Sequence, residues 1–543
     1  MKRLSMICML LAGVFLVTGC AGAEKDIKEE ELVGKEEYAR VTLFSDVEFW
    51  HPPIWDVAKG TISGDISAKT NVVLDVKNII GDPDKQLSLM LVNDELPDII
   101  SVVDDTVTSQ LVTSGKVWKI DEFLEKYKPE SHLLEDYPAD VKYELTKRDA
   151  AWYALASHID SPDARKIWRA SDKCYEELSE YGDNKAIIWN KELLGQLELN
   201  VEELQTEDEV LAAFEKAKRY SDIIPLLVDG DTYQEHTLAM LANSFGAEYV
   251  DKEGNYKDIY LQPEMKDALK FLNTVVQKDY MDIEQMSMAN DQIKGLMAGG
   301  RVLCFIGNIA NTAIDAREWV SSGPVLSSTG KTPVLGKSER ATTGWINTFI
   351  SKDCKEPERI ADFINYMTSE EGLLLWCYGE EGVHYVRNEE ELIELTQEGR
   401  DARNNYTQSG LFAWWMFVNT AWERSVRAPF EEGSVDEASY EINTAYATDP
   451  RTVLYDSSLI SDLSDSLQQG SAYAQMEENI EGWKKIQIPK VILAENDAAF
   501  EQAYQKLIKG LEDAQIYELD KKKNEQYQRN CKEYGRSIEK INE

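Results

Sequence analysis

A helix followed by a strand is the clearest pattern of apolar and polar positions in the chain. Leu87, Met90 and Leu91 lie at i, i+3 and i+4, which is one face of a short helix. Pro97 cannot continue that helix, and it favours extended geometry at the residue before it. The segment 99–103 is apolar except for one serine, which is typical of a strand buried on both faces. The pattern therefore predicts an α/β unit.

Similar strands and helices recur along the chain. Apolar runs predict further strands at residues 41–44, 71–76, 151–156, 186–189, 301–306 and 343–350. Amphipathic spacing predicts helices at 120–127 and, after a capping-box pattern beginning at Thr206, up to about residue 220. The last part of the chain is mainly helical in pattern and highly charged. The fold class is therefore α/β, and the length exceeds one hydrophobic core, so two or more lobes are expected.

Polar and aromatic residues follow several predicted strands. Asp104 follows the strand 99–103, and Asp46 and Trp50 follow the strand 41–44. In open α/β sheets, ligands sit outside the carboxyl ends of strands. The alternative is a solvated turn with a packed tryptophan, and for the aromatic run 412–418 it is a helix core. The candidate ligand-binding residues are Asp46, Trp50, Asp104, Trp152, Asn308, Trp345, Trp414 and Trp415, followed by Glu48, Phe49 and Trp189.

Charge and composition exclude several classes of function. The formal net charge of −40 disfavours nucleic acid as a partner. After Cys20, five cysteines remain without tight spacing, which argues against a disulfide framework and a CxxC metal site. The five histidines are scattered, and neither an HExxH nor a GxSxG motif is present. The loop 251–258 has its glycine at position 4 rather than 6 of a calcium loop, so it predicts a hairpin turn, with a calcium site as the alternative. We expect no catalytic residues, no metal and no cofactor.

The first residues have the pattern of an export signal. A basic start at Lys2 and Arg3 precedes an apolar run at 4–17, which is too short to span a bilayer. Cys20 follows a small residue in a sequence that resembles a bacterial lipobox, which implies cleavage before Cys20 and its lipidation. The alternative is an ordinary secretory signal with an incidental cysteine. Residues 21–38 are polar and predict a flexible tether.

The phrase helix–Leu96-Pro97-Asp98–strand closely resembles the extracellular solute-binding proteins of ABC importers, the family-1 or maltose-binding-protein-like type, and most of all its large lipoprotein members. The resemblance continues in family order through residues 113–127, 186–194, 365–376, 378–385 and 524–530. It implies a two-lobed periplasmic-binding-protein-like fold with a hinge of two or three crossings and a helical C-terminal region. The expected parts are a signal peptide at 1–19, a lipidated tether at 20–38, a first lobe of 39–156 plus 346–385, and a second lobe of 157–345 plus 386–543, with the side of the helices at 490–543 left open.

This resemblance also implies a function. The protein would be a monomeric receptor, anchored by lipid to the extracytoplasmic face of the bacterial membrane. It would capture a small solute between its lobes by hinge closure and deliver it to the permease subunits of an ABC importer. Carboxylates and amides suit the polar edges of a sugar and flat rings suit its apolar faces, so a carbohydrate or oligosaccharide is the expected solute. The alternatives are a surface glycan-degrading enzyme and a non-transport adhesive lipoprotein.

Cys20→Ala is expected to release the protein from the membrane fraction, because a lipid with two or more chains anchors stably and the variant cannot carry it. Cell fractionation measures the change, with Cys174→Ala as the control that leaves the signal intact. A Cys20→Ala variant that stays with the membranes as the parent does would contradict the anchor.

Overall fold

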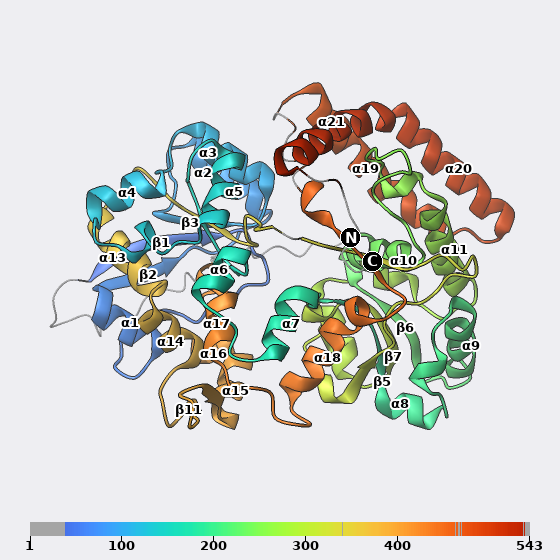
Figure 1. The fold of residues 1–543 in the computed structure, drawn as a ribbon, viewed down its shortest axis with the longest axis horizontal. Coiled ribbons are helices and arrows are strands. Elements are labelled where there is room, and N and C mark those ends of the chain that lie inside the picture. The colour runs from blue at the N-terminus through green and yellow to red at the C-terminus, as the bar shows by residue number, and fades with distance from the viewer. Residues whose placement is uncertain are drawn as a thin grey trace, which may run out of the picture.

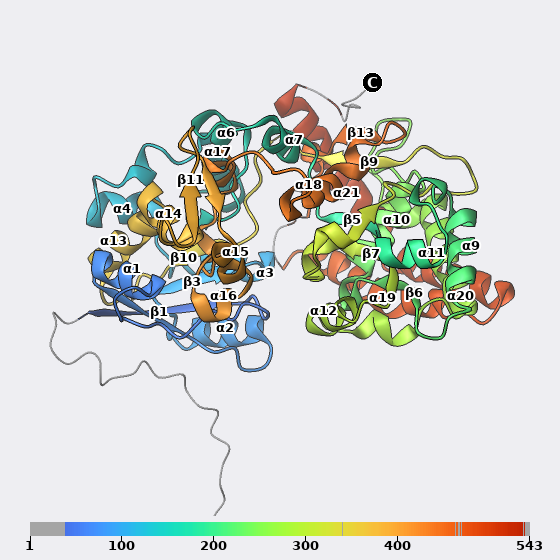
Figure 2. The ribbon, with the colours of Figure 1, turned by 90° about the horizontal axis from the view of Figure 1, so that it is seen from below.

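The computed structural model describes residues 38–338, 340–461, 463–464, 467, 470–535 and 537. They form two α/β lobes (Figures 1 and 2). One hydrophobic core collects buried residues from 41–164 and 341–422, and the larger core of the other lobe collects them from 187–325 and 446–519. The chain therefore passes between the lobes three times, which confirms the predicted fold class. The signal peptide, Cys20 and all of the tether but Tyr38 lie outside the described residues.

The first lobe is built on a five-stranded sheet of order β2-β1-β3-β10-β4. Strands β1 (Ala39–Ser45), β2 (Val72–Val76) and β3 (Ile99–Val102) are parallel. Strand β10 (Asn347–Ile350) returns from the second lobe and pairs antiparallel with β3 and with β4 (Leu155–Ala156). All four residues of β3 are buried, as the apolar run predicts. Only the last two residues of the predicted strand 151–156 are extended in the sheet.

Helices cover both faces of this sheet, and their ends follow local sequence signals. Helix α2 has Pro83 at its first turn, and the carboxylate of Asp82 accepts from the N–H of Lys85. These helices include α1 (Ile62–Thr70), α2 (Pro83–Val92), α3 (Asp105–Ser114), α4 (Ile120–Tyr127), α5 (Ala139–Asp149), α13 (Pro357–Met367) and α14 (Glu370–Tyr378).

The second lobe is built on a four-stranded sheet of order β6-β7-β5-β8. Strands β6 (Ile224–Val228) and β7 (Val302–Asn308) are parallel, whereas β5 (Lys185–Asn190) is antiparallel to β7 and to β8 (Trp319–Ser321). A separate parallel pair joins β9 (Val334–Lys337) to β13 (Val453–Asp456). The carboxyl ends of β6 and β7 and the start of β5 therefore share one edge of the sheet.

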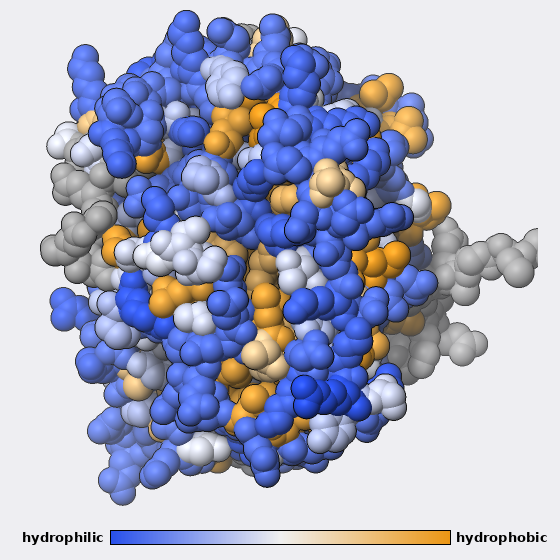
Figure 3. Space-filling model, turned by 90° about the vertical axis from the view of Figure 1, so that its right-hand side faces the viewer, coloured by the Kyte–Doolittle hydropathy of each residue, from blue (hydrophilic) through white to orange (hydrophobic). Residues whose placement is uncertain are grey.

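The C-terminal helices belong to the second lobe, which settles the side that the sequence left open. Ile488, Leu507 and Ile516 are buried in its core. The outer side, with α9, α11 and α20, is mostly hydrophilic with narrow apolar seams (Figures 1 and 3). The helices of this lobe are α8 (Lys191–Gln196), α9 (Glu207–Ala217), α10 (Ala239–Ser244), α11 (Pro263–Gln277), α12 (Asn290–Ala298), α18 (Val435–Thr448), α19 (Ala472–Ile492), α20 (Asp497–Asp513) and α21 (Ile516–Tyr534).

Two local predictions for this lobe are confirmed. The Thr206 hydroxyl and the Glu209 carboxylate form a reciprocal capping box at the start of α9. The N–H of Asp251 donates to the carbonyl of Asn255 at 2.9 Å, which closes the hairpin predicted for residues 251–258.

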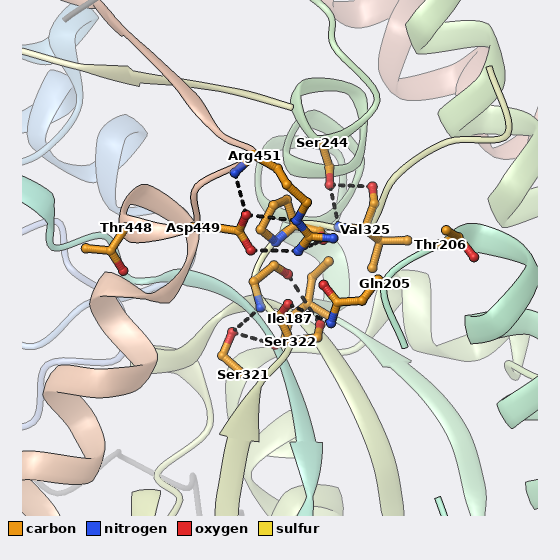
Figure 4. A network of polar contacts seen from close by, with 12 residues as sticks. Ile187, Gln205, Thr206, Ser244, Ser321, Ser322, Val325, Thr448, Asp449 and Arg451 are labelled. Atoms are coloured by element: carbon orange, nitrogen blue, oxygen red, sulfur yellow. Dashed lines mark hydrogen bonds and ion pairs between the residues drawn. The ribbon is translucent and has the colours of Figure 1, made fainter. Parts of the chain in front are cut away.

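A polar network fixes the end of α18 near the second-lobe sheet (Figure 4). The guanidinium of Arg451 donates to Asp449 at 2.8 and 2.6 Å, and also to the carbonyl of Pro324 at 3.4 Å. The hydroxyl of Ser244 donates to the carbonyl of Val325 at 2.8 Å. These bonds supply partners for the irregular backbone that follows β8.

The predicted return to the second lobe after residue 385 is wrong. Ile393, Trp414 and Trp422 are buried in the first core, where Trp414 packs on Trp50 and Trp55. The aromatic rings bury apolar area there, so the chain leaves the first lobe only after residue 422. The elements of this segment are β11 (Tyr385–Arg387), β12 (Ile393–Leu395), α15 (Gln397–Asn404), α16 (Tyr406–Ser409) and α17 (Thr420–Val426). The other lobe boundaries, at residues 156 and 346, stay predictions.

A buried carboxyl on α21 makes stability depend on pH. Burial, and next the carboxylate of Asp258, raise the pKa of Asp520 from 3.8 to about 7. Because the folded state holds this proton more tightly than the unfolded state, the stabilising contribution is complete below about pH 4 and is lost as the pH rises through 7.

Asp520→Asn removes this titration, since the amide cannot ionise. We therefore expect the substitution to raise the melting temperature relative to the parent more at pH 8 than at pH 5. Thermal unfolding at both pH values measures the difference, and Asp513→Asn on the exposed side of α20 is the control. An equal shift at pH 5 and pH 8 would be inconsistent with the raised pKa.

Candidate ligand-binding cleft

A cavity of about 760 Å³ lies between the two lobes. His158 and Gly344 line it from the first lobe, and Lys185 and Asn308 line it from the second. Asn308 ends β7, Lys185 begins β5 opposite it, and His158 follows β4. The cavity therefore sits at the strand ends where an open α/β sheet meets its ligand.

On the first-lobe side, four aromatic residues form a cluster that we name the aromatic platform: Phe49, Trp345, Trp415 and Tyr406. The rings of Phe49 and Trp345 are stacked with centroids 6.3 Å apart and an interplanar angle of 16°. Trp415 lies 6.2 Å from Trp345, 6.1 Å from Phe49 and 4.9 Å from Tyr406. Phe49 is 44% exposed and Trp345 is 41% exposed, so large apolar ring area remains accessible.

His158 connects the aromatic platform to the cavity. It lines the cavity, and its ring meets Trp345 edge-on with centroids 5.3 Å apart. Burial lowers the pKa of His158 to about 4, so its imidazole is neutral at pH 7. A neutral ring adds hydrogen-bonding atoms to this side of the cleft without adding charge.

A glycine holds Trp345 in this position. Gly344 has a φ of +79°, and a Cβ there would come within 2.6 Å of the carbonyl oxygen of Ser157. Only glycine accepts this close approach and this backbone conformation without strain. Trp345 is thus placed beside His158 by the tight contact between two chain crossings.

On the second-lobe side, a buried carboxylate organises the strand ends. Asp229 directly follows β6 and accepts from the backbone N–H of Asn308 at 2.9 Å and from the side-chain amide of Asn311 at 3.0 Å. Its other neighbour is His236, whose Nδ1 lies 2.5 Å from the carboxylate. His236 and Asn308 both line the cavity. Asp229 and His236 were not predicted, although Asp229 ends a strand just as Asp104 does.

Charged side chains connect the first and third crossings beside the cavity. Asp160 accepts from Arg165 at 2.9 Å and also pairs with Arg424. Arg424 donates in addition to the hydroxyl of Ser179 at 2.6 Å. Arg165 belongs to α6 (Pro162–Ile167), Ser179 to α7 (Lys173–Tyr181) and Arg424 to α17, so these contacts connect three helices.

Several predicted binding residues are core residues instead. Trp50, Trp152 and Trp414 are buried in the first core, and Trp189 is buried in the second. The indole N–H of Trp50 donates to the carbonyl of Ala413 at 2.7 Å, which fixes it among these rings. None of the four is more than 6% exposed and none lines the cavity between the lobes, so the structure gives them packing roles and does not support their predicted contact with a ligand there.

The two predicted aspartates have structural partners. Asp46 is buried and accepts from the backbone N–H groups of Val103 at 2.9 Å and Asp104 at 3.1 Å. Burial raises the pKa of Asp46 to about 6. Asp104 accepts from the N–H of Val107 at 2.8 Å and caps α3. Both therefore brace the strand ends. Asn308 lines the cavity, and Trp345 contacts the lining residue His158, with Trp415 and Phe49 beside it. Contact of these four residues with a ligand stays a prediction, as does that of the exposed Glu48.

Residues 70–373 match the model of the family described as bacterial extracellular solute-binding protein. The chain belongs to this family. Membership makes it a solute-binding protein rather than an enzyme and confirms the resemblance read from the sequence. None of the curated protein sequences matches the chain.

Several solved structures of solute-binding proteins share the fold. The FusA substrate-binding protein of an ABC transporter from S. pneumoniae, in complex with kestose, has a TM-score of 0.68 and 14% identity over 90% of this chain and 99% of that one. An HMO-binding solute-binding protein from Bifidobacterium longum infantis has a TM-score of 0.61 and 13% identity, with 91% and 99% covered. The N-glycan transport protein NgtS from Streptococcus pneumoniae has a TM-score of 0.56 and 14% identity, again with 91% and 99% covered. At these identities the likeness shows the fold alone.

In the part of the chain that the structure describes, no helix is long and apolar enough to cross a membrane. Among the same residues, no group of three or more His, Cys, Asp or Glu side chains is arranged to hold a metal ion.

Substitution of tryptophans should distinguish those in the core from those in the aromatic platform by the loss of stability. Trp152→Ala is expected to cost about 3–5 kcal/mol of unfolding free energy, because it leaves a large cavity. Trp345→Ala should cost much less, since 41% of this residue is already exposed. Denaturant unfolding of both variants measures the two values. Equal losses at the two positions would mean that Trp345 is also a packing residue.

Proposed function

We propose that this solute-binding protein captures an oligosaccharide between its lobes and delivers it to an ABC importer, while a lipid on Cys20 holds it at the extracytoplasmic face of the membrane. The lobes close over the ligand by hinge motion about the three crossings. Each part of this proposal is supported by a different observation.

The aromatic platform is the observation that carries the proposal. Two large rings with more than 40% of their surface exposed, Phe49 and Trp345, lie beside a cavity lined mainly by polar side chains. A contiguous cluster of exposed aromatic residues, unlike scattered single ones, marks a surface that binds a ligand or a partner. A sugar supplies apolar C–H faces for such rings and hydroxyl groups for the polar wall, whereas a purely apolar or purely ionic solute uses only half of the site.

The cavity and the relatives agree with a ligand larger than one sugar. Small-molecule sites commonly measure about 300–1,000 Å³, and the cavity of about 760 Å³ adds to the separate area of the aromatic platform. Structures that share the fold are described with kestose, with HMO binding and with N-glycan transport. These ligands support a carbohydrate as the solute class.

The lipid anchor rests on the sequence alone. Gly19 and Cys20 follow a basic start and a short apolar run. A receptor that serves a membrane permease gains from confinement to the membrane surface, because a tether raises its effective concentration there.

Substitution of the aromatic platform should weaken sugar binding without unfolding the protein. Trp345→Ala and Trp415→Ala are each expected to reduce affinity by about 1–3 kcal/mol, from lost apolar contact and ring stacking. Calorimetry with a panel of oligosaccharides that stabilise the parent measures this. Tyr517→Ala, at an exposed aromatic position in α21, is the matched control. Unchanged affinity in both platform variants would show that the rings do not touch the sugar, and a panel without any binder would reject a carbohydrate solute.

A further inference from the structure

One part of the cavity wall holds more cationic groups than carboxylates can neutralise. Lys185, Lys337, Arg165 and Arg424 all line the cavity, and the charges of the other three act on Lys337. The carboxylates that line the cavity are Asp160, Asp183 and Glu423, and Glu423 is already paired with Arg403 at 2.6 Å. The imbalance stands out in a protein whose formal net charge is −40.

The two arginines of this group share one carboxylate. Arg165 donates to Asp160 at 2.9 Å, and Arg424 pairs with the other oxygen of the same group. In contrast, Arg427, which also lines the cavity, has its own partner in Asp436 at 2.7 Å. Arg340 likewise pairs with Glu144. The excess of positive charge is therefore local to the wall around Lys337.

Among the residues that the structure describes, neither lysine has a carboxylate within ion-pair distance, and Asp183 acts on Lys337 only through its nearby charge. The Nζ of Lys337 donates to the carbonyl oxygen of Gly182. An ammonium group has three N–H donors, so this single carbonyl leaves donors of Lys337 available to a ligand. Burial is the main cause that lowers the pKa of Lys337, and the nearby cations lower it further against the opposing effect of Asp183. A partly buried, uncompensated ammonium group is costly unless an anion meets it.

We propose that the captured solute carries an anionic group, a carboxylate, sulfate or phosphate, and that Lys185 and Lys337 bind this group. The inference rests on the proposed function, since it names the chemical class of the oligosaccharide. Both lysines lie at the second-lobe edge that faces the cleft. Lys185 is paired with Asn308 in the strand register, and Lys337 ends β9.

This placement gives the two lobes different roles. The aromatic platform belongs to the first lobe and takes an apolar sugar face, while the two lysines belong to the second lobe and take the charge. An acidic oligosaccharide that meets both would bridge the lobes. Its charge would then contribute most when the cleft is closed, because water is excluded there and electrostatic interactions are stronger.

Paired ligands test this inference directly. Binding of uronate-bearing and sulfated oligosaccharides is compared by calorimetry with that of neutral oligosaccharides of the same length, such as trigalacturonate and the corresponding galactose trisaccharide. The parent should bind an acidic member at least tenfold more tightly than its neutral counterpart. Lys185→Gln and Lys337→Gln should each weaken binding of the acidic member more than that of the neutral member, so that most of the tenfold difference is lost. The salt dependence should fall in the same variants, since one charge contact is lost.

The controls separate this inference from the proposed function. Lys509→Gln, which removes an exposed lysine from α20, should behave as the parent, and melting curves verify that every variant is folded. If neutral oligosaccharides bind as tightly as acidic ones and neither lysine substitution changes this, the anionic solute is rejected while the carbohydrate function stands. If no oligosaccharide of either kind binds, the proposed function itself is rejected.

Discussion

The chain passes between two separately packed cores three times, and the rest of the structure depends on this constraint. Each lobe buries its own apolar residues, so the interface between them is free to hold polar groups and a cavity. Crossing segments lack the regular backbone pairing of a sheet, so side chains must satisfy them. Arg165 does so by donating to the backbone carbonyls of Asp160 and Ser179 at 3.2 and 3.1 Å. The polar wall of the cleft is thus a consequence of the topology.

Adjacent residues of similar chemistry have opposite roles at the cleft. Phe49 is exposed and stacks on Trp345, whereas Trp50 is buried and donates to Ala413. Nothing in the local sequence distinguishes the two, because each environment is created by segments about 300 or more residues away. The sequence predicts where aromatic residues gather, but the return of residues 341–422 to the first core decides which ring is covered.

Local signals allowed much of the fold to be predicted, and long-range packing limited the rest. The run 99–103 predicts β3 because a strand covered on both faces has few polar positions. Thr206 and Glu209 predict the start of α9 because the capping box is a short-range contact. The third crossing was misplaced because Trp414 and Trp422 are buried against partners far away in the chain. Of the residues at the cleft, Asn308 and Trp345 could be predicted because they lie at or near predicted strands. His236 could not be predicted, because its place depends on a contact with Asp229 that has no signature in the sequence.

The charges at the crossings bear on how ligand binding and lobe movement are coupled. Asp160 lies on the first crossing and Arg424 on the third, and Arg424 also reaches Ser179 on α7. A rotation of the lobes must either carry this group of side chains as one unit or break contacts that are partly buried, which is costly because an unpaired buried charge loses its solvation. The group is therefore best suited to remain intact while the segments on either side of it bend. The two arginines of this group share one carboxylate, so positive charge remains at the hinge. An anion that enters the cavity would meet this charge as well as the lysines at the second-lobe edge. Closure would bring both sets of charges toward the same bound group.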